Sequence, residues 1–225
     1  MRLIDMHCDT FWLMMRKNGV TLQKNELCID MEKMKKAGSM AQFFASFIHM
    51  SEFNGANAVE EAYQYTLEMI AYGKAELDKC SDSIEIAHNY NELIANRDNG
   101  KMSAILTVEE GGILNGKMEY LEELYQQGIR LITLTWNHEN CIGFPNSREP
   151  VVMNQGLKPF GIEVVKRMND LGMIIDVSHL SDGGFWDVME HSTKPVVASH
   201  SNARALCNHP RNLTDEMIKT LAKKG

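Results

Sequence analysis

The sequence predicts an α/β protein built as a (β/α)8 barrel of the TIM type, amidohydrolase-like, with about six of the eight strands inside the chain. Three observations predict this fold class. Short apolar runs recur along the chain, segments of helical periodicity lie between them, and a glycine precedes most of the runs. Strands that are buried on both faces of a parallel sheet have this nearly continuous hydrophobicity.

The expected elements alternate along the chain. The apolar runs predict strands at residues 3–6, 40–48, 103–108, 130–135, 173–177 and 195–199. The helical spacing predicts helices at residues 58–79, 118–127, 157–171, 185–191 and 215–224. Gly38, Gly100, Gly128 and Gly172 mark turns from helix to strand, because a glycine just past a helix supplies the left-handed residue that ends it.

An open, doubly wound sheet is the competing architecture. A nucleotide-binding sheet of that kind carries a glycine-rich loop after its first strand, whereas residues 5–9 read DMHCD. The barrel is therefore preferred. Without a linker or a low-complexity tract, residues 1–225 are expected to form a single hydrolase domain.

Composition excludes several classes of protein. The net charge is −7, and clustered basic residues typical of nucleic-acid binding are lacking. No run approaches the roughly 18 apolar residues of a membrane span, so neither a nucleic acid nor a membrane is expected as a partner. The five cysteines are odd in number and form no CxxC pair, which favours reduced thiols and a cytoplasmic protein.

Polar side chains follow four of the predicted strands. His7 and Asp9 follow the first strand, Glu109 and Glu110 the third, and His179 and His200 two later ones. Chemistry in barrel enzymes occurs at the carboxyl ends of the strands. Two sets of histidine and carboxylate that share one carboxylate would suit a two-metal hydrolase with a hydroxide held between the ions. Zinc fits these ligands best, and Mn²⁺ or Fe²⁺ would be accepted.

These segments resemble a known family. The stretches IDMHCDT, TVEEGG, TLTWN, DVSHLS, SHSNAR and HPRN are similar, in this order, to signature segments of the membrane (renal) dipeptidases, which are dinuclear zinc metallopeptidases. The gap of 21 from His179 to His200, and of 11 from His200 to Arg211, agrees with the family's spacing. The match runs from the first strand to about residue 214.

The resemblance implies a pair of Zn²⁺ ions. His7 and Asp9 would hold one ion, and His179 and His200 the other. Glu110 would bridge the ions and so take part in catalysis, because the family's bridging glutamate directly precedes the Gly-Gly pair.

The resemblance also implies how a substrate would bind. Arg211 would grip its terminal carboxylate, which a planar guanidinium can do with two hydrogen bonds. Many members place a histidine directly after Thr-Leu-Thr, whereas this chain has Trp136 there. His138 would then be the catalytic imidazole, or Asn137 the donor to the oxyanion, and Trp136 a wall of the substrate pocket.

The implied activity is hydrolysis of dipeptides, including those with a D-residue on the carboxyl side. Two alternatives stay open: another metal-dependent amidohydrolase that acts on N-acyl amino acids or cyclic amides, and a non-catalytic metal-binding barrel. The usual first-strand motif of the amidohydrolases is His-x-His, and here it is His7-Cys8-Asp9, which favours the dipeptidase. The partner is a small dipeptide, and a homodimer is left open.

The end of the sequence carries one more expectation. Residues 215–225 repeat the pattern of a helix followed by glycine that precedes earlier strands. A closed barrel needs all eight strands. The chain is therefore expected to be truncated at its C-terminal end and inactive by itself, with the proton-shuttling acid of the family beyond residue 225.

Overall fold

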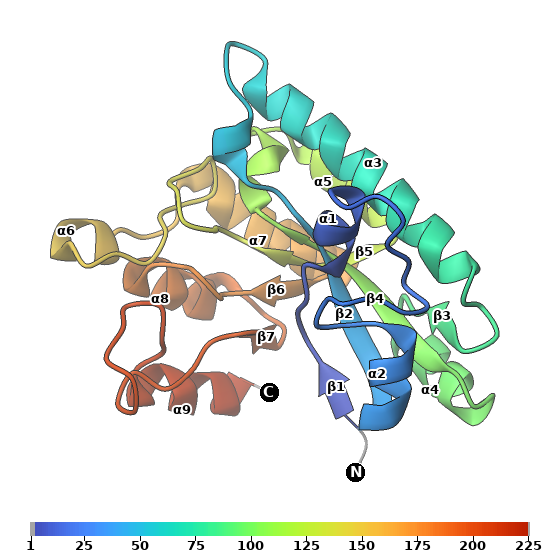
Figure 1. Cartoon of the computed structure of the whole chain (residues 1–225). Helices are drawn as coiled ribbons and strands as arrows, with labels where there is room; N and C mark the ends of the chain where they lie inside the picture. The colour runs from blue at the N-terminus through green and yellow to red at the C-terminus, as the bar shows by residue number, and fades with distance from the viewer. Residues whose placement is uncertain (1–2, 225) are drawn as a thin grey trace.

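The computed structural model describes residues 3–224 and shows a curved parallel β-sheet with helices packed along one side of it (Figure 1). The strands of the described residues are β1 (Leu3–Asp5), β2 (Ser39–Phe47), β3 (Ile84–Ile86), β4 (Met102–Glu109), β5 (Ile129–Thr133), β6 (Ile174–Asp176) and β7 (Val196–Val197). Their paired order is β1-β2-β4-β5-β6-β7, and every pairing is parallel. The carboxyl ends of the strands therefore meet at one edge of the sheet.

Strand β4 is the centre of this sheet. One of its edges pairs with β2 over residues 103–109. Its other edge is shared, because β3 pairs with residues 102–104 and β5 with residues 106–109. β3 therefore pairs only with the start of β4, and β5 pairs with its carboxyl end.

Helices follow most of the strands. They are α1 (Thr10–Met15), α2 (Met31–Ala37), α3 (Ala58–Asp78), α4 (Tyr90–Asp98), α5 (Met118–Gln126), α6 (Pro150–Met153), α7 (Pro159–Leu171), α8 (Asp182–His191) and α9 (Asp215–Lys224), with 3₁₀ turns η1 (Met50–Glu52) and η2 (Gly111–Leu114). α3, α5 and α7 lie side by side along the sheet in Figure 1. Among residues 3–224, no helix is both long and apolar enough to cross a bilayer.

The two faces of the sheet bury different residues. Phe44, Leu106 and Ile132 belong to the main core with the helices. The opposite, concave face carries a small cluster formed by Ala41, Phe43, Ile105 and Leu131. Successive side chains of a strand point to opposite faces, so a strand residue two or four positions after a member of this cluster shares the concave face.

Local sequence signals explain where several elements begin and end. The side chain of Asp30 accepts from the backbone N–H of Lys33 and so caps α2, and Ser181 caps α8 in the same way. Gly38 ends α2 with φ +68° and Gly172 ends α7 with φ +70°. Gly100 and Gly128 also have positive φ, so all four predicted turns are confirmed.

The predicted fold class is confirmed as a parallel half-barrel. All six expected strands are present, with ends that differ by a few residues. The short strand β3 was not predicted, because its sequence, Ile-Glu-Ile, is too short to display a period. Helices α1, α4 and α6 were not predicted either.

Candidate metal centre

A row of polar residues crosses the concave face at the carboxyl ends of the strands. The register aligns Glu109 of β4 with Thr133 of β5, and Thr133 with Asp176 of β6. Glu109 lies four residues after Ile105, and Thr133 lies two after Leu131, so both share the concave face with the apolar cluster. All three residues are buried. The sheet thus carries two carboxylates on the floor of this site.

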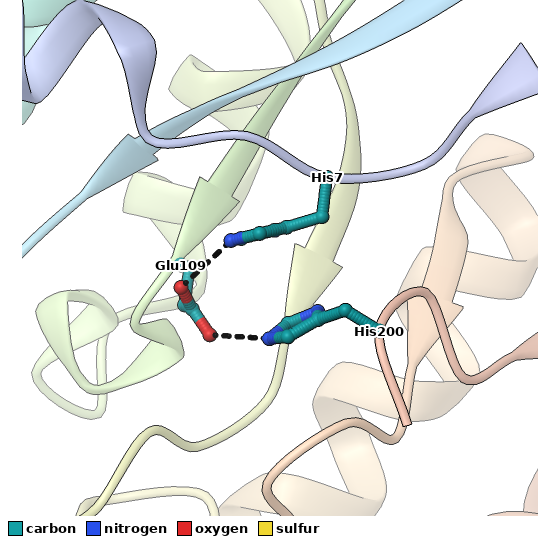
Figure 2. A group of neighbouring side chains, drawn as sticks. All are labelled: His7, Glu109 and His200. Carbon is teal, nitrogen blue, oxygen red and sulfur yellow. Dashed lines mark ion pairs between the residues drawn. The ribbon is translucent and has the colours of Figure 1, made fainter. Parts of the chain in front are cut away.

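Two histidines from opposite ends of the sheet converge on Glu109. Figure 2 shows His7, which follows β1, and His200, which follows β7, with their imidazoles turned toward this carboxylate. His7 Nε2 lies 3.4 Å from Glu109 Oε2, and His200 Nε2 lies 3.4 Å from Glu109 Oε1. The rings of His7 and His200 are stacked with their centroids 3.9 Å apart. The sheet therefore curves enough to bring its two outer strands to one site.

His179 completes the group from the loop after β6. Its Nε2 lies 3.1 Å from Glu109 Oε1 and 3.0 Å from His200 Nε2. The backbone of His179 has φ +70°, a left-handed conformation that costs a non-glycine residue energy. Asn146 holds this conformation, because its backbone N–H and its side chain both donate to the carbonyl oxygen of His179, at 2.7 and 3.0 Å.

Asp9 joins the group from the beginning of α1. Its Oδ1 lies 3.2 Å from His7 Nε2. Both residues lie beyond the strand, because β1 ends at Asp5 and Asp9 is the N-cap residue of α1. The loop, rather than the strand pleat, brings the two side chains together.

The charges of the group shift its pKa values. Burial would raise the pKa of Glu109, but the neighbouring imidazoles of His179, His200 and His7 together outweigh burial and hold this pKa far below its usual value. Burial would lower the pKa of His7, but Asp9 and Glu109 together raise it. For His179 burial dominates and lowers the pKa. Glu109 is therefore an anion that is buried among imidazoles.

The residues of this group fit a bound metal. Glu109 Oε1 and Asp9 Oδ1 are buried and have no hydrogen-bond partner among residues 3–224. Asn137 Oδ1 lies 3.2 Å from His179 Nδ1 and accepts a hydrogen bond from it, because a carbonyl oxygen can only accept. His179 therefore carries its proton on Nδ1. The Nε2 lone pair of His179 is then left facing Glu109. Acceptors that converge without a proton are stabilised by a cation, and imidazole with carboxylate is a zinc ligand set.

Glu110 points away from the histidines. Its Oε2 accepts from the backbone N–H of Trp136 at 2.9 Å, and its Oε1 accepts from Gly112 N at 2.6 Å and from the side chain of Asn140. Burial raises the pKa of Glu110 to about 7. The structure thus places Glu109, and not the expected Glu110, among the histidines, whereas Glu110 anchors the loop that carries Trp136.

The loop after β5 holds three more of the expected site residues, Trp136, Asn137 and His138. The ring of Trp136 lies 6.4 Å from that of His179. It packs edge-on against Phe47, the last residue of β2, and against His49, which follows β2. His138 is exposed, and its ring is 5.9 Å from that of Trp136. The structure therefore places Trp136 beside His179 and does not bring His138 into the group around Glu109. The side-chain oxygen of Asn137 is directed to His179.

Arg211 lies beyond the histidines, in the segment before α9. Its Nη1 donates to Ser201 Oγ at 2.7 Å, and its backbone N–H donates to His209 Nδ1 at 3.2 Å. The guanidinium is half-buried and has no carboxylate within ion-pair distance among residues 3–224. Burial lowers the pKa of Arg211, and the negative charges of Asp176 and Glu109 oppose this shift. The remaining donors of Arg211 are therefore free for an anionic ligand.

Comparison with known proteins identifies the family. The sequence profile of the membrane dipeptidases (peptidase family M19) matches residues 1–225. An uncharacterized dipeptidase of Schizosaccharomyces pombe is 30% identical over 215 residues, which cover 93% of this chain and 50% of that protein. An uncharacterized protein of Klebsiella pneumoniae is 34% identical over 164 residues, which cover 70% of this chain and 57% of that protein.

Solved structures agree in fold. A metallopeptidase of Rhodobacter sphaeroides, solved with a phosphinate mimic of the dipeptide L-Ala-D-Ala, superposes with a TM-score of 0.86 at 22% identity. The match covers 99% of this chain and 71% of that one. The chain spans 46% to 66% of the length of four curated relatives that it matches. On the match of the family profile over residues 1–225, the chain belongs to the membrane dipeptidase family, peptidase family M19.

Proposed function

We propose that the protein is a zinc-dependent dipeptidase. One observation carries the proposal: in a chain of peptidase family M19, three histidines from three strand ends converge on the buried carboxylate of Glu109. Such a cluster is costly to bury unless a cation pairs with it. The name of the S. pombe relative, a dipeptidase, supports the same activity.

Glu109 is the bridging ligand in this proposal, in place of Glu110. Its two oxygens face different histidines, because Oε2 is directed to His7 whereas Oε1 is directed to His179 and His200. One ion would be held by His7 and Asp9, the other by His179 and His200, with one oxygen of Glu109 on each. When bound, the pair of ions lowers the pKa of water and polarises the scissile carbonyl.

The residues around the metal centre would select the substrate. Arg211 supplies free guanidinium donors for the terminal carboxylate of a dipeptide, and a short distance from this contact to the metals would exclude longer peptides. Trp136 offers an aromatic wall beside His179 for a substrate side chain. The ligand of the R. sphaeroides structure, a mimic of L-Ala-D-Ala, supports a D-residue on the carboxyl side.

Dipeptide hydrolysis by the protein at its full natural length tests the proposal. The assay compares L-Ala-D-Ala, L-Ala-L-Ala, an N-acyl amino acid and a cyclic amide, before and after removal of metal with a chelator. We expect hydrolysis of the dipeptides that is lost with the chelator and returns with Zn²⁺. Faster turnover of the N-acyl amino acid or the cyclic amide would favour another amidohydrolase. Metal binding without turnover of any substrate would favour a non-catalytic barrel.

A further inference from the structure

A buried carboxylate lies behind the metal centre. Asp176 is the last residue of β6 and is fully buried. Its Oδ1 accepts from the backbone N–H groups of Ser178 at 3.0 Å and Ser199 at 2.9 Å. Its Oδ2 accepts from the hydroxyls of Thr133 at 2.7 Å and Ser199 at 2.6 Å. The carboxylate thus ties together the ends of β5, β6 and β7, and it is not itself directed to the histidines.

The hydroxyl of Ser199 connects this carboxylate to His200. Ser199 Oγ lies 2.7 Å from His200 Nδ1 on one side and 2.6 Å from Asp176 Oδ2 on the other. A carboxylate only accepts, so the single hydroxyl proton of Ser199 goes to Asp176. The opposite assignment would leave two oxygens 2.6 Å apart with no proton between them. Ser199 Oγ must therefore accept from His200, which places the imidazole proton on Nδ1.

The Nε2 atom of His200 is then unprotonated and faces Glu109 Oε1 at 3.4 Å. A metal-binding histidine needs this arrangement, in which the other ring nitrogen donates to a neighbour that fixes the tautomer. His179 obtains it directly from Asn137. We propose that Asp176 is a positioning residue, which acts through Ser199 to hold His200 in the tautomer that binds metal through Nε2. This inference rests on the metal centre of the proposed function.

The tautomer can be measured without metal and without substitution. In the ¹⁵N-labelled, metal-free protein, nitrogen–proton correlations of the imidazole assign the proton to one ring nitrogen. We expect His200 to be protonated at Nδ1 when neutral. A neutral His200 protonated at Nε2 would overturn the proposal, whatever the outcome of the activity assays.

Two matched variants then isolate the link through Ser199. Ser199→Ala and Thr133→Val each remove one hydroxyl donor from the same oxygen of Asp176, but only Ser199 contacts His200. We expect Ser199→Ala to shift the tautomer of His200 and to weaken Zn²⁺ binding, measured by calorimetry, by about 10- to 100-fold. Thr133→Val should leave both unchanged. Ser199→Thr, which keeps the hydroxyl, should restore the tautomer and the affinity.

The outcomes separate this inference from the proposed function. Equal Zn²⁺ affinity in Ser199→Ala and the unsubstituted protein would refute the positioning role but leave the metal centre intact. An equal loss in Ser199→Ala and Thr133→Val would show that the network acts only by stabilising the fold, a result that thermal unfolding of both variants would reveal. A failure of the unsubstituted protein to bind Zn²⁺ would refute the proposed function itself.

Discussion

Replacing Arg211 with Met should separate substrate binding from metal binding. Among residues 3–224, the guanidinium of Arg211 makes one hydrogen bond, to Ser201, and its other donors have no partner. In the proposed complex they bind the terminal carboxylate of the dipeptide. Loss of a charge-assisted hydrogen bond costs about 1.5–3 kcal/mol, which corresponds to about one to two decades in affinity. The half-buried position of the group favours the upper part of that range, because water competes less there.

The assay is steady-state hydrolysis of a dipeptide, with zinc content measured on the same samples. We expect KM to rise by about one to two decades while both ions stay bound, since Arg211 contacts none of the proposed ligands. The Arg211→Lys variant keeps the charge but loses the planar guanidinium, so its KM should lie between those of the unsubstituted protein and Arg211→Met. A dipeptide amide should be a poor substrate of the unsubstituted enzyme. Equal kcat/KM values for the acid and the amide would refute this reasoning.

Two further predictions concern stability. Gly161→Ala should lower the free energy of unfolding by about 1–3 kcal/mol or more, because the new Cβ would lie 2.1 Å from the carbonyl oxygen of Ile142. Gly100→Ala, at a left-handed position with open space, should cost less in the same denaturant titration. Burial would raise the pKa of Asp30, but hydrogen bonds from Lys33 and Asn25 outweigh burial and lower this pKa from 3.8. The carboxylate therefore stabilises the fold above pH 3.8 and loses that effect as the pH falls through its folded value. The Asp30→Asn variant should therefore have a lower free energy of unfolding than the unsubstituted protein at pH 7. If the difference between the two proteins did not become smaller in acid, this prediction would be contradicted.

The sequence could predict the positions of the strands because buried parallel strands are nearly continuous apolar runs. It could also predict that histidines and carboxylates gather at their ends, since parallel strands share one carboxyl edge. To predict which of Glu109 and Glu110 faces the histidines, one must also know which face of the sheet carries the site. Counting by two from Ile105 places Glu109 on the concave face, but only the structure shows which face carries the small cluster.

Other features of the site depend on register and loop conformation, which the sequence does not reveal. Asp176 was not among the expected site residues, because its link to His200 becomes visible only when β7 is placed beside β6. The contact of Asn137 with His179 likewise depends on a loop anchored by Glu110. Trp136 could be recognised as a departure from the family pattern, but its packing against His49 could not.

The bridging role of Glu109 is the central claim, and the metal content of two neighbouring variants tests it most directly. Glu109→Gln and Glu110→Gln are compared by zinc stoichiometry after equilibration with Zn²⁺, with circular dichroism as the control for folding. Since only Glu109 faces the histidines, we expect Glu109→Gln to lose both ions together and Glu110→Gln to keep about two per chain. Full occupancy in Glu109→Gln, with loss of both ions in Glu110→Gln, would contradict the account.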